Sequence, residues 1–177
     1  RRVLFRSNQQ EVLYKGKIDL AKLNINSKVS NIIIKKYDGK DVIVERSGNK
    51  NLSTITTKES GSELTIDEEF NNNNSNLGKS IDDIVRYLVD ELYTSHNSDI
   101  TVYIPENIDI NVNTNNGGLY INGVNANNLN FNTQYGNISL SENSNIKTLN
   151  IKSNSDISLK VREVYCIDNL SIESNYV

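Results

Sequence analysis

The chain has 177 residues, 36% of them hydrophobic, which is enough for one domain with a lean core. A formal net charge of −3 gives no general electrostatic reason to bind nucleic acid or an anionic membrane. One His, one Cys and no Met or Trp make a zinc cluster, a disulfide framework or a His-based triad hard to build, so most enzyme classes are disfavoured.

The first seven residues differ in composition from the rest of the chain. Residues 1–7 contain three of the six Arg residues, and they resemble the translation of a sequencing adaptor joined to a reading frame. We expect an artefact there, and a basic juxtamembrane stub is the alternative. Residues 8–177 are predicted to form one domain, with an irregular N-terminal half over 8–70, a loop and helix insert over 71–98 and regular coils over 99–177.

Short strands with period-two alternation are predicted throughout the N-terminal half. Residues 23–34 align without gaps with residues 129–140, so they are an upstream copy of a unit that recurs later. Gly48 and Gly61 mark turns between further strands. These strands are expected at 41–45, 53–57 and 63–67.

One amphipathic helix is predicted in the insert. It follows the polar run 71–76 and begins at Ser80, with Asp83 completing a capping box. The apolar residues that follow have helical spacing: Ile81, Ile84, Val85, Leu88, Val89 and Leu92. A helix over 80–93 could bind a partner or a membrane surface. We favour a structural cover for the side of the strand stack, because exposed sheet edges need protection.

The C-terminal half contains a repeat. Its units begin at Ile110, Leu129, Leu149 and Leu170, which are 19, 20 and 21 residues apart. Each unit has two short strands joined by a turn rich in Gly, Asn, Asp and Ser. Such units bury their apolar residues by stacking, so the sequence predicts an all-β fold, a parallel beta-solenoid of about 20 residues per coil. An antiparallel sandwich is the alternative.

The alternation assigns inward and outward columns of side chains. The inward columns are Ile110, Leu129, Leu149 and Leu170, and then Val112, Phe131, Ile151 and Ile172. The outward columns are Asn111, Asn130 and Asn150, and then Asn113, Asn132 and Lys152. An array of amides can form hydrogen bonds with a glycan or another polymer, so this outward ladder is the candidate binding site. Asn also stacks along solenoids for structural reasons, and the 30 Asn residues fit an AT-rich genome.

The motifs around residues 99–138 resemble a known bacterial family. A strand over 99–104 ends at Pro105, followed by the alternating residues 108–121 and a Thr-x-x-Gly-x-Ile block over 133–138. This pattern resembles the adhesin-like domains of unknown function called toast-rack domains, over about residues 17–177. The resemblance implies a beta-helix-like module in the cell envelope or outside the cell. It implies an envelope polymer or another envelope protein as partner, and it supplies no catalytic residue.

Two functional hypotheses follow. We favour a non-enzymatic envelope interaction module with no catalytic residue, no cofactor, no metal site, no nucleic-acid partner and no membrane span. His96 is expected in an exposed loop and Cys166 in the core. The carboxylates of the regular coils occupy different repeat positions, so they are not expected to stack into a catalytic pair or triplet: Asp109, Glu142, Asp156, Glu163, Asp168 and Glu173. The alternative is a carbohydrate-active beta-helix enzyme or a glycan-binding module. A cleft that gathers Asp41, Glu45, Asp67 and Glu68 would favour the enzyme.

Overall fold

The computed structural model describes residues 10–48, 50, 53–71, 98–105, 107–141, 143–162 and 166–174. These residues form β-strands, turns and loops, and they contain no helix. The all-β prediction is therefore confirmed for this part of the chain. The helix expected at 80–93, residues 1–7 and His96 lie outside the described residues, as does the side chain of Cys166.

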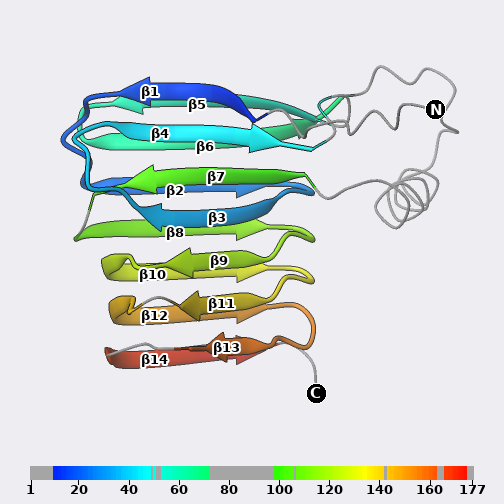
Figure 1. The fold of residues 1–177 in the computed structure, drawn as a ribbon. Coiled ribbons are helices and arrows are strands. Elements are labelled where there is room, and N and C mark those ends of the chain that lie inside the picture. Colours follow the sequence, from blue (N-terminus) through cyan, green and yellow to red (C-terminus); the bar gives the residue numbers. More distant parts are fainter. Residues whose placement is uncertain are drawn as a thin grey trace, which may run out of the picture.

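The strands form two seven-stranded sheets that lie one behind the other (Figure 1). In spatial order, sheet A contains β1 (Glu11–Gly16), β4 (Val42–Ser47), β7 (Asp99–Ile104), β3 (Asn31–Lys36), β9 (Leu119–Asn122), β11 (Ile138–Ser141) and β13 (Leu159–Val161). Sheet B contains β14 (Cys166–Ser174), β12 (Asn145–Ser153), β10 (Asn125–Thr133), β8 (Ile108–Thr114), β2 (Lys22–Ser27), β6 (Glu63–Phe70) and β5 (Ser53–Ser60).

From β6 onward the chain alternates between the two sheets, and from β8 onward each strand pairs in parallel with its equivalent in the next coil. Leu129 lies beside Ile110 on one side and Leu149 on the other, and Leu149 in turn lies beside Leu170. Phe131 likewise lies between Val112 and Ile151. The predicted neighbours and their parallel register are thus confirmed, and the fold is solenoid-like. Leu170 and Ile172, expected in the inward columns, are instead 50% and 47% exposed, because β14 is the last strand of sheet B and no further coil covers it among the described residues. The antiparallel sandwich is wrong for these coils, because neighbouring strands from β8 to β14 pair in parallel in both sheets.

The upstream copy of the repeat stacks out of chain order. β2 lies between β6 and β8, and β3 lies between β7 and β9. Leu23 and Ile25 pair with Ile110 and Val112, and all four side chains are fully buried. Equivalent inward residues therefore place the copy directly on the first regular coil, 87 residues away in the sequence.

Two strands, β4 and β5, depart from the predicted continuation of the parallel stack. β4 is antiparallel to β1 and β7, and β5 is antiparallel to β6. The turn at 61–62 joins β5 to β6 directly, and so short a connection permits only an antiparallel pair. Leu13, Tyr14 and Ile55 pack against the core at this end. The reversed strands cover the end of the stack and stop its parallel propagation.

The two sheets enclose one hydrophobic core, and glycines allow the coils to stack closely at one edge. A Cβ atom on Gly117 would lie 2.0 Å from the carbonyl oxygen of Ser30. A Cβ atom on Gly136 would lie 2.3 Å from the carbonyl oxygen of Gly117. Both contacts are too short for any side chain, so glycine is required where successive turns meet.

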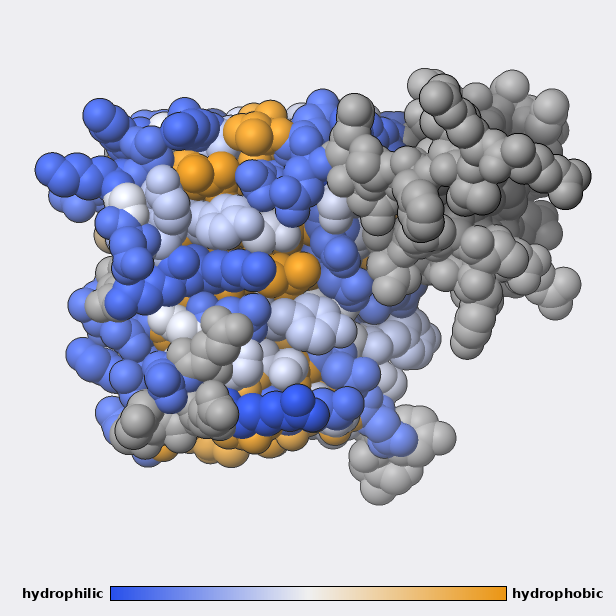
Figure 2. All heavy atoms as spheres, viewed as in Figure 1, coloured by the Kyte–Doolittle hydropathy of each residue, from blue (hydrophilic) through white to orange (hydrophobic). Residues whose placement is uncertain are grey.

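The other end of the stack, at β13 and β14, exposes hydrophobic side chains. Val161, Leu170 and Ile172 are 47%, 50% and 47% exposed. Figure 2 shows hydrophobic residues along the lower edge of the molecule, where Figure 1 places these two strands, while most of the face in view is hydrophilic. No helix among the described residues is long and apolar enough to cross a membrane.

Candidate binding site

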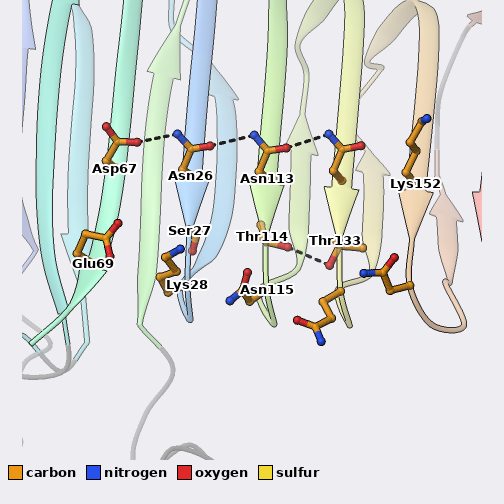
Figure 3. Close-up of a pocket in the computed structure, with 13 residues that line it drawn as sticks. Asn26, Ser27, Lys28, Asp67, Glu69, Asn113, Thr114, Asn115, Thr133 and Lys152 are labelled. Carbon is orange, nitrogen blue, oxygen red and sulfur yellow. Dashed lines mark hydrogen bonds between the residues drawn. The ribbon is translucent and has the colours of Figure 1, made fainter. Parts of the chain in front are cut away.

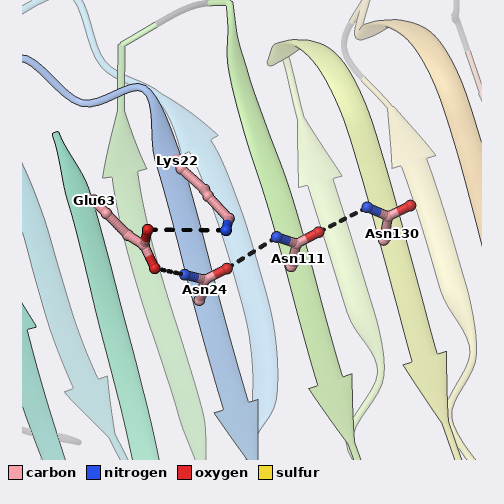
Figure 4. Close-up of polar contacts among 5 residues, drawn as sticks. All are labelled: Lys22, Asn24, Glu63, Asn111 and Asn130. Atoms are coloured by element: carbon pink, nitrogen blue, oxygen red, sulfur yellow. Dashed lines mark hydrogen bonds and ion pairs between the residues drawn. The ribbon is translucent and has the colours of Figure 1, made fainter.

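The outward side of sheet B carries two rows of asparagine side chains that cross several strands. The first row joins Asn24, Asn111 and Asn130 (Figure 4) and continues to Asn150 on the next strand. Asn111 donates to Asn24 at 2.9 Å, Asn130 donates to Asn111 at 2.7 Å, and Asn150 donates to Asn130 at 2.9 Å. Asn24 donates to Glu63, so the row ends on a carboxylate.

The second row lies two residues further along the same strands (Figure 3). Asn132 donates to Asn113 and Asn113 donates to Asn26, each at 2.9 Å. Asn26 donates to Asp67 at 2.6 Å. On the next strand, Lys152 continues the column and forms an ion pair with Glu173 at 3.0 Å. The second row therefore runs from a carboxylate on β6 towards an ammonium group on β12.

Both rows have the same direction. Every Nδ2 group donates towards β6, and every row ends there on an acceptor, so each hydrogen bond polarises the next. Within a row, each inner amide uses one N–H and one lone pair of its oxygen. The remaining N–H and lone pair can bind a ligand or water. The rows therefore stabilise the parallel stack and also present an ordered polar surface.

A shallow groove of about 610 Å³ lies over the second row, near the carboxyl ends of the strands. Its lining residues are Asn26, Ser27, Lys28, Asp67, Glu69, Asn113, Thr114, Asn115, Asn132, Thr133, Gln134, Lys152 and Asn154. Three of the predicted site residues, Asn113, Asn132 and Lys152, therefore line one groove. The other three, Asn111, Asn130 and Asn150, form the first row, which does not line it.

Sequence reasoning missed the residues that the upstream coil adds to this face. Asn24 and Asn26 occupy the columns of Asn111 and Asn113. The gapless alignment of residues 23–34 with 129–140 already contained this information, because it equates Asn24 and Asn26 with members of the two predicted columns. Asp67, the end of the second row, could not be placed without the pairing of β6 with β2.

The four carboxylates that would have favoured an enzyme do not share a cleft. Asp41 forms an ion pair with Lys15 at 3.7 Å beside sheet A, and Glu45 belongs to β4 of that sheet. Asp67 points outward from sheet B, whereas Glu68 is fully buried between the sheets. Within the described ranges, no group of three or more His, Cys, Asp or Glu residues could hold a metal ion.

Glu68 is instead the centre of a buried hydrogen-bond network. Its Oε2 atom accepts from the backbone N–H groups of Lys28, Val29 and Ser30 at 2.9, 3.1 and 3.1 Å, and the Ser27 hydroxyl lies 2.7 Å away. Its Oε1 atom accepts from the hydroxyls of Ser30 and Ser53 at 2.6 and 2.7 Å. This carboxylate therefore fixes the turn after β2.

Burial alone would raise the pKa of Glu68, but the hydrogen bonds from Ser30, Ser53, Ser27 and Val29 outweigh it and hold the pKa below its ordinary value. Arg46 is also buried and donates to the Ser53 carbonyl oxygen at 2.8 Å. Because Glu68 is enclosed and fully hydrogen-bonded, it has a structural role. In the sequence, Glu68 continues the period-two alternation of Leu64 and Ile66. This pattern alone does not distinguish a buried structural carboxylate from one on the surface.

The solenoid-like stack and its polar outer faces define a class of all-β, coil-stacking domains. The chain belongs to the Toastrack DUF4097 family, whose model matches residues 20–172. The toast-rack resemblance predicted from the sequence is thereby confirmed. No curated protein matches the chain.

Two solved bacterial structures share the fold. One is a candidate cell adhesion protein from Clostridium sporogenes, with 14% identity, a TM-score of 0.51, and coverage of 94% of this chain and 98% of that one. The other is a candidate lipid-binding protein from Parabacteroides distasonis, with 16% identity and a TM-score of 0.54. The match covers 93% of this chain but only 62% of the Parabacteroides protein. At these identities the similarity establishes the fold alone.

Proposed function

We propose that this domain is a non-enzymatic interaction module of the bacterial cell envelope that binds a polymer on the outward face of sheet B. The observation that carries the proposal is the second amide row, Asn26, Asn113 and Asn132, lying along the open groove. Coils of about 20 residues, as the repeat spacing predicts, would present the same outward position at each strand. A polymer with repeating hydroxyl groups fits such a periodic row of donors and acceptors.

The second row is the better contact surface of the two. Asn113 and Asn132 are exposed, whereas Asn111, Asn130 and Asn150 are half-buried. Because the groove is shallow and polar, a bound chain would bury little apolar surface, and a single domain should bind weakly. Display of several copies would strengthen binding by avidity, which suits a protein that acts at a cell surface.

Two further observations support a binding module in the envelope. The Clostridium relative carries a cell-adhesion name, and its similarity extends over nearly the whole of both chains. Asp41, Glu45, Asp67 and Glu68 are divided between two sheets and between inward and outward faces, which disfavours joint acid and base catalysis.

One observation favours the alternative, glycan hydrolysis. Asp67 and Glu69 are two residues apart on β6, so their side chains lie on the same face of the strand, and both line the groove. Residues i and i+2 of a strand are about 6.6 to 6.8 Å apart, close to the carboxylate spacing of inverting glycosidases. An assay for release of reducing ends from envelope polysaccharides separates the two functions. Release that disappears in Asp67→Asn and Glu69→Gln would overturn the non-enzymatic proposal.

The binding test compares two double variants that remove the same chemistry from neighbouring rows. Asn113→Ala/Asn132→Ala alters the groove, and Asn111→Ala/Asn130→Ala alters the first row beside it. Each domain is screened against immobilised glycans and purified peptidoglycan, as a monomer and as a streptavidin-linked tetramer. We expect the groove variant to lose at least about fivefold in affinity, a loss equivalent to about 1 kcal/mol from two hydrogen-bonding amides.

The first-row variant is the matched control, because it interrupts an equivalent amide row outside the groove. It should retain most of the binding if its circular dichroism spectrum stays unchanged. Equal losses in both variants would show that the rows act only through the stability of the sheet. Unchanged binding in the groove variant would remove this groove as the site.

A further inference from the structure

The outward face of sheet A contains a second groove, which the proposed function does not use. Its volume is about 580 Å³, and it crosses β7, β3, β9, β11 and the end of β13. Its lining residues are Asn31, Ile33, Lys35, Asp99, Tyr120, Asn122, Ser139, Ser141, Lys160 and Arg162. The groove therefore brings together residues that are up to 131 positions apart in the sequence (31 to 162).

The lining is cationic although the chain as a whole has a net charge of −3. Lys35, Lys160 and Arg162 contribute three positive charges, and Asp99 contributes the single carboxylate. Asp99 is engaged with Asn31, whose Nδ2 group donates to it at 3.1 Å. Among the described residues, no carboxylate forms an ion pair with any of the three cations, whereas Lys15, Lys22, Lys50 and Lys152 each have such a partner.

The strand register sets the spacing of these charges. Lys160 lies beside Ser139, which lies beside Tyr120, and Tyr120 lies beside Ile33. With neighbouring strands about 4.8 Å apart, the backbone positions of Tyr120 and Lys160 are separated by about 10 Å. Lys35 on β3 lies three strands from β13, or about 14 Å. The cations therefore flank an aromatic ring and do not crowd one point.

The groups between the cations suit a sugar chain. Tyr120 is 42% exposed, so its ring offers a flat apolar surface to the groove. Ser141 and Asn122 lie side by side, with the Ser141 hydroxyl donating to the Asn122 side-chain oxygen at 2.8 Å. The Asn122 amide retains its N–H groups for a ligand. A ring surface, an amide, hydroxyls and separated cations together match pyranose faces, hydroxyl groups and carboxylates.

We propose that the groove on the outward face of sheet A binds an acidic polysaccharide, with Tyr120 against a sugar ring and Lys35, Lys160 and Arg162 paired with its carboxylates. This site is separate from the amide face of sheet B and does not depend on the function proposed for it. The two grooves lie on opposite sheets of the same stack, so their ligands can bind independently.

The test measures binding of polygalacturonate oligosaccharides to this chain by isothermal titration calorimetry. Methyl-esterified oligosaccharides of the same length keep the sugar backbone and remove the charge, and polyglutamate keeps the charge and removes the sugar. We expect binding of the acidic oligosaccharide that weakens as the sodium chloride concentration rises, and much weaker binding of both comparison ligands. Equal affinity for the esterified sugar, or for polyglutamate, would overturn the proposal.

Matched variants locate the site. Lys160→Gln/Arg162→Gln should weaken binding about tenfold, because two charge contacts are lost. Lys58→Gln/Lys147→Gln removes the same charge from exposed positions on sheet B and should leave the affinity unchanged. Tyr120→Ala should weaken binding about fivefold, whereas Tyr135→Ala, in an exposed turn, should not. Equal effects from the sheet B variants would show non-specific attraction and refute the assignment.

Discussion

Replacement of Glu68 by Gln tests whether the buried carboxylate organises the turn after β2. Three backbone N–H groups donate to its Oε2 atom. These donors are fixed in the turn, so they could not avoid a glutamine NH₂ group placed at the Oε2 position. The amide nitrogen of the introduced glutamine must therefore face the hydroxyls of Ser30 and Ser53, which can reorient to accept. The variant loses the charge and two of the original contacts, and we expect it to cost about 2 to 3 kcal/mol of unfolding free energy. Glu68→Ala leaves all the donors and Arg46 uncompensated, at about 3 to 5 kcal/mol.

The pH dependence gives a second test of the same carboxylate. Because the folded pKa of Glu68 is lowered, its contribution to stability is complete above the ordinary pKa of 4.5. The contribution is lost as the pH falls through the folded pKa, because protonation then occurs in both states. The stability difference between the unaltered chain and Glu68→Gln should therefore narrow on acidification below that range.

Urea denaturation, followed by circular dichroism at neutral and acidic pH, measures both effects. Glu69→Gln is the control, since this neighbouring carboxylate is exposed and its replacement should change stability by less than about 0.5 kcal/mol. A neutral-pH loss for Glu68→Gln no larger than for Glu69→Gln would refute the proposed network. A difference that stays constant with pH would show that the charge of Glu68 is not what stabilises the turn.

Three other perturbations address the core, the turns and an ionisable side chain. Phe131→Ala should cost about 3 to 5 kcal/mol in urea denaturation, whereas Asn132→Ala should cost under about 1, and similar costs would contradict the inward and outward assignment. Gly136→Ala should lower stability by about 1 to 3 kcal/mol through its clash with the neighbouring turn, and an unchanged melting temperature would disprove that close contact. Burial and the hydrogen bond to Glu59 raise the pKa of Tyr14 to about 12, so its contribution to stability should be present below pH 10 and lost as the pH rises towards 12. Ultraviolet titration should show late-titrating tyrosine absorbance that decreases in Tyr14→Phe, with Tyr103, whose pKa is also raised by burial and by Glu45, still contributing; an identical titration of that variant would refute the assignment.

The regular coils were predictable because one rule governs them. In Leu129-Asn-Phe131-Asn-Thr133, alternation assigns each side chain to a face, and the repeat spacing assigns each residue its neighbours. Sequence similarity between coils therefore encodes both the register and the amide rows. The same similarity identified residues 23–34 as a copy of the unit, but it did not reveal that this copy lies between β6 and β8.

The N-terminal end was less predictable because direction and partner depend on contacts distant in the sequence. The strand over 41–45 has the same alternation whether it runs parallel or antiparallel to its neighbour, and the structure makes β4 antiparallel to β7. Only the short turn at 61–62 carried a local signal for reversal. Glu68 was similarly ambiguous, since its burial depends on donors from β2 and β5 that the sequence does not place beside it.

The outer faces differ for a reason that lies in the stacking itself. In sheet B, equivalent positions carry the same residue, Asn, and adjacent amides satisfy one another across about 4.8 Å. In sheet A, equivalent positions carry Tyr120, Ser139 and Lys160, which cannot form such a uniform chain of hydrogen bonds. Their polar groups stay available to a ligand, and their charges do not cancel. Repetition therefore stabilises the stack through the amide rows of sheet B, and divergence from the repeat leaves on sheet A the unlike side chains on which the second proposed site depends.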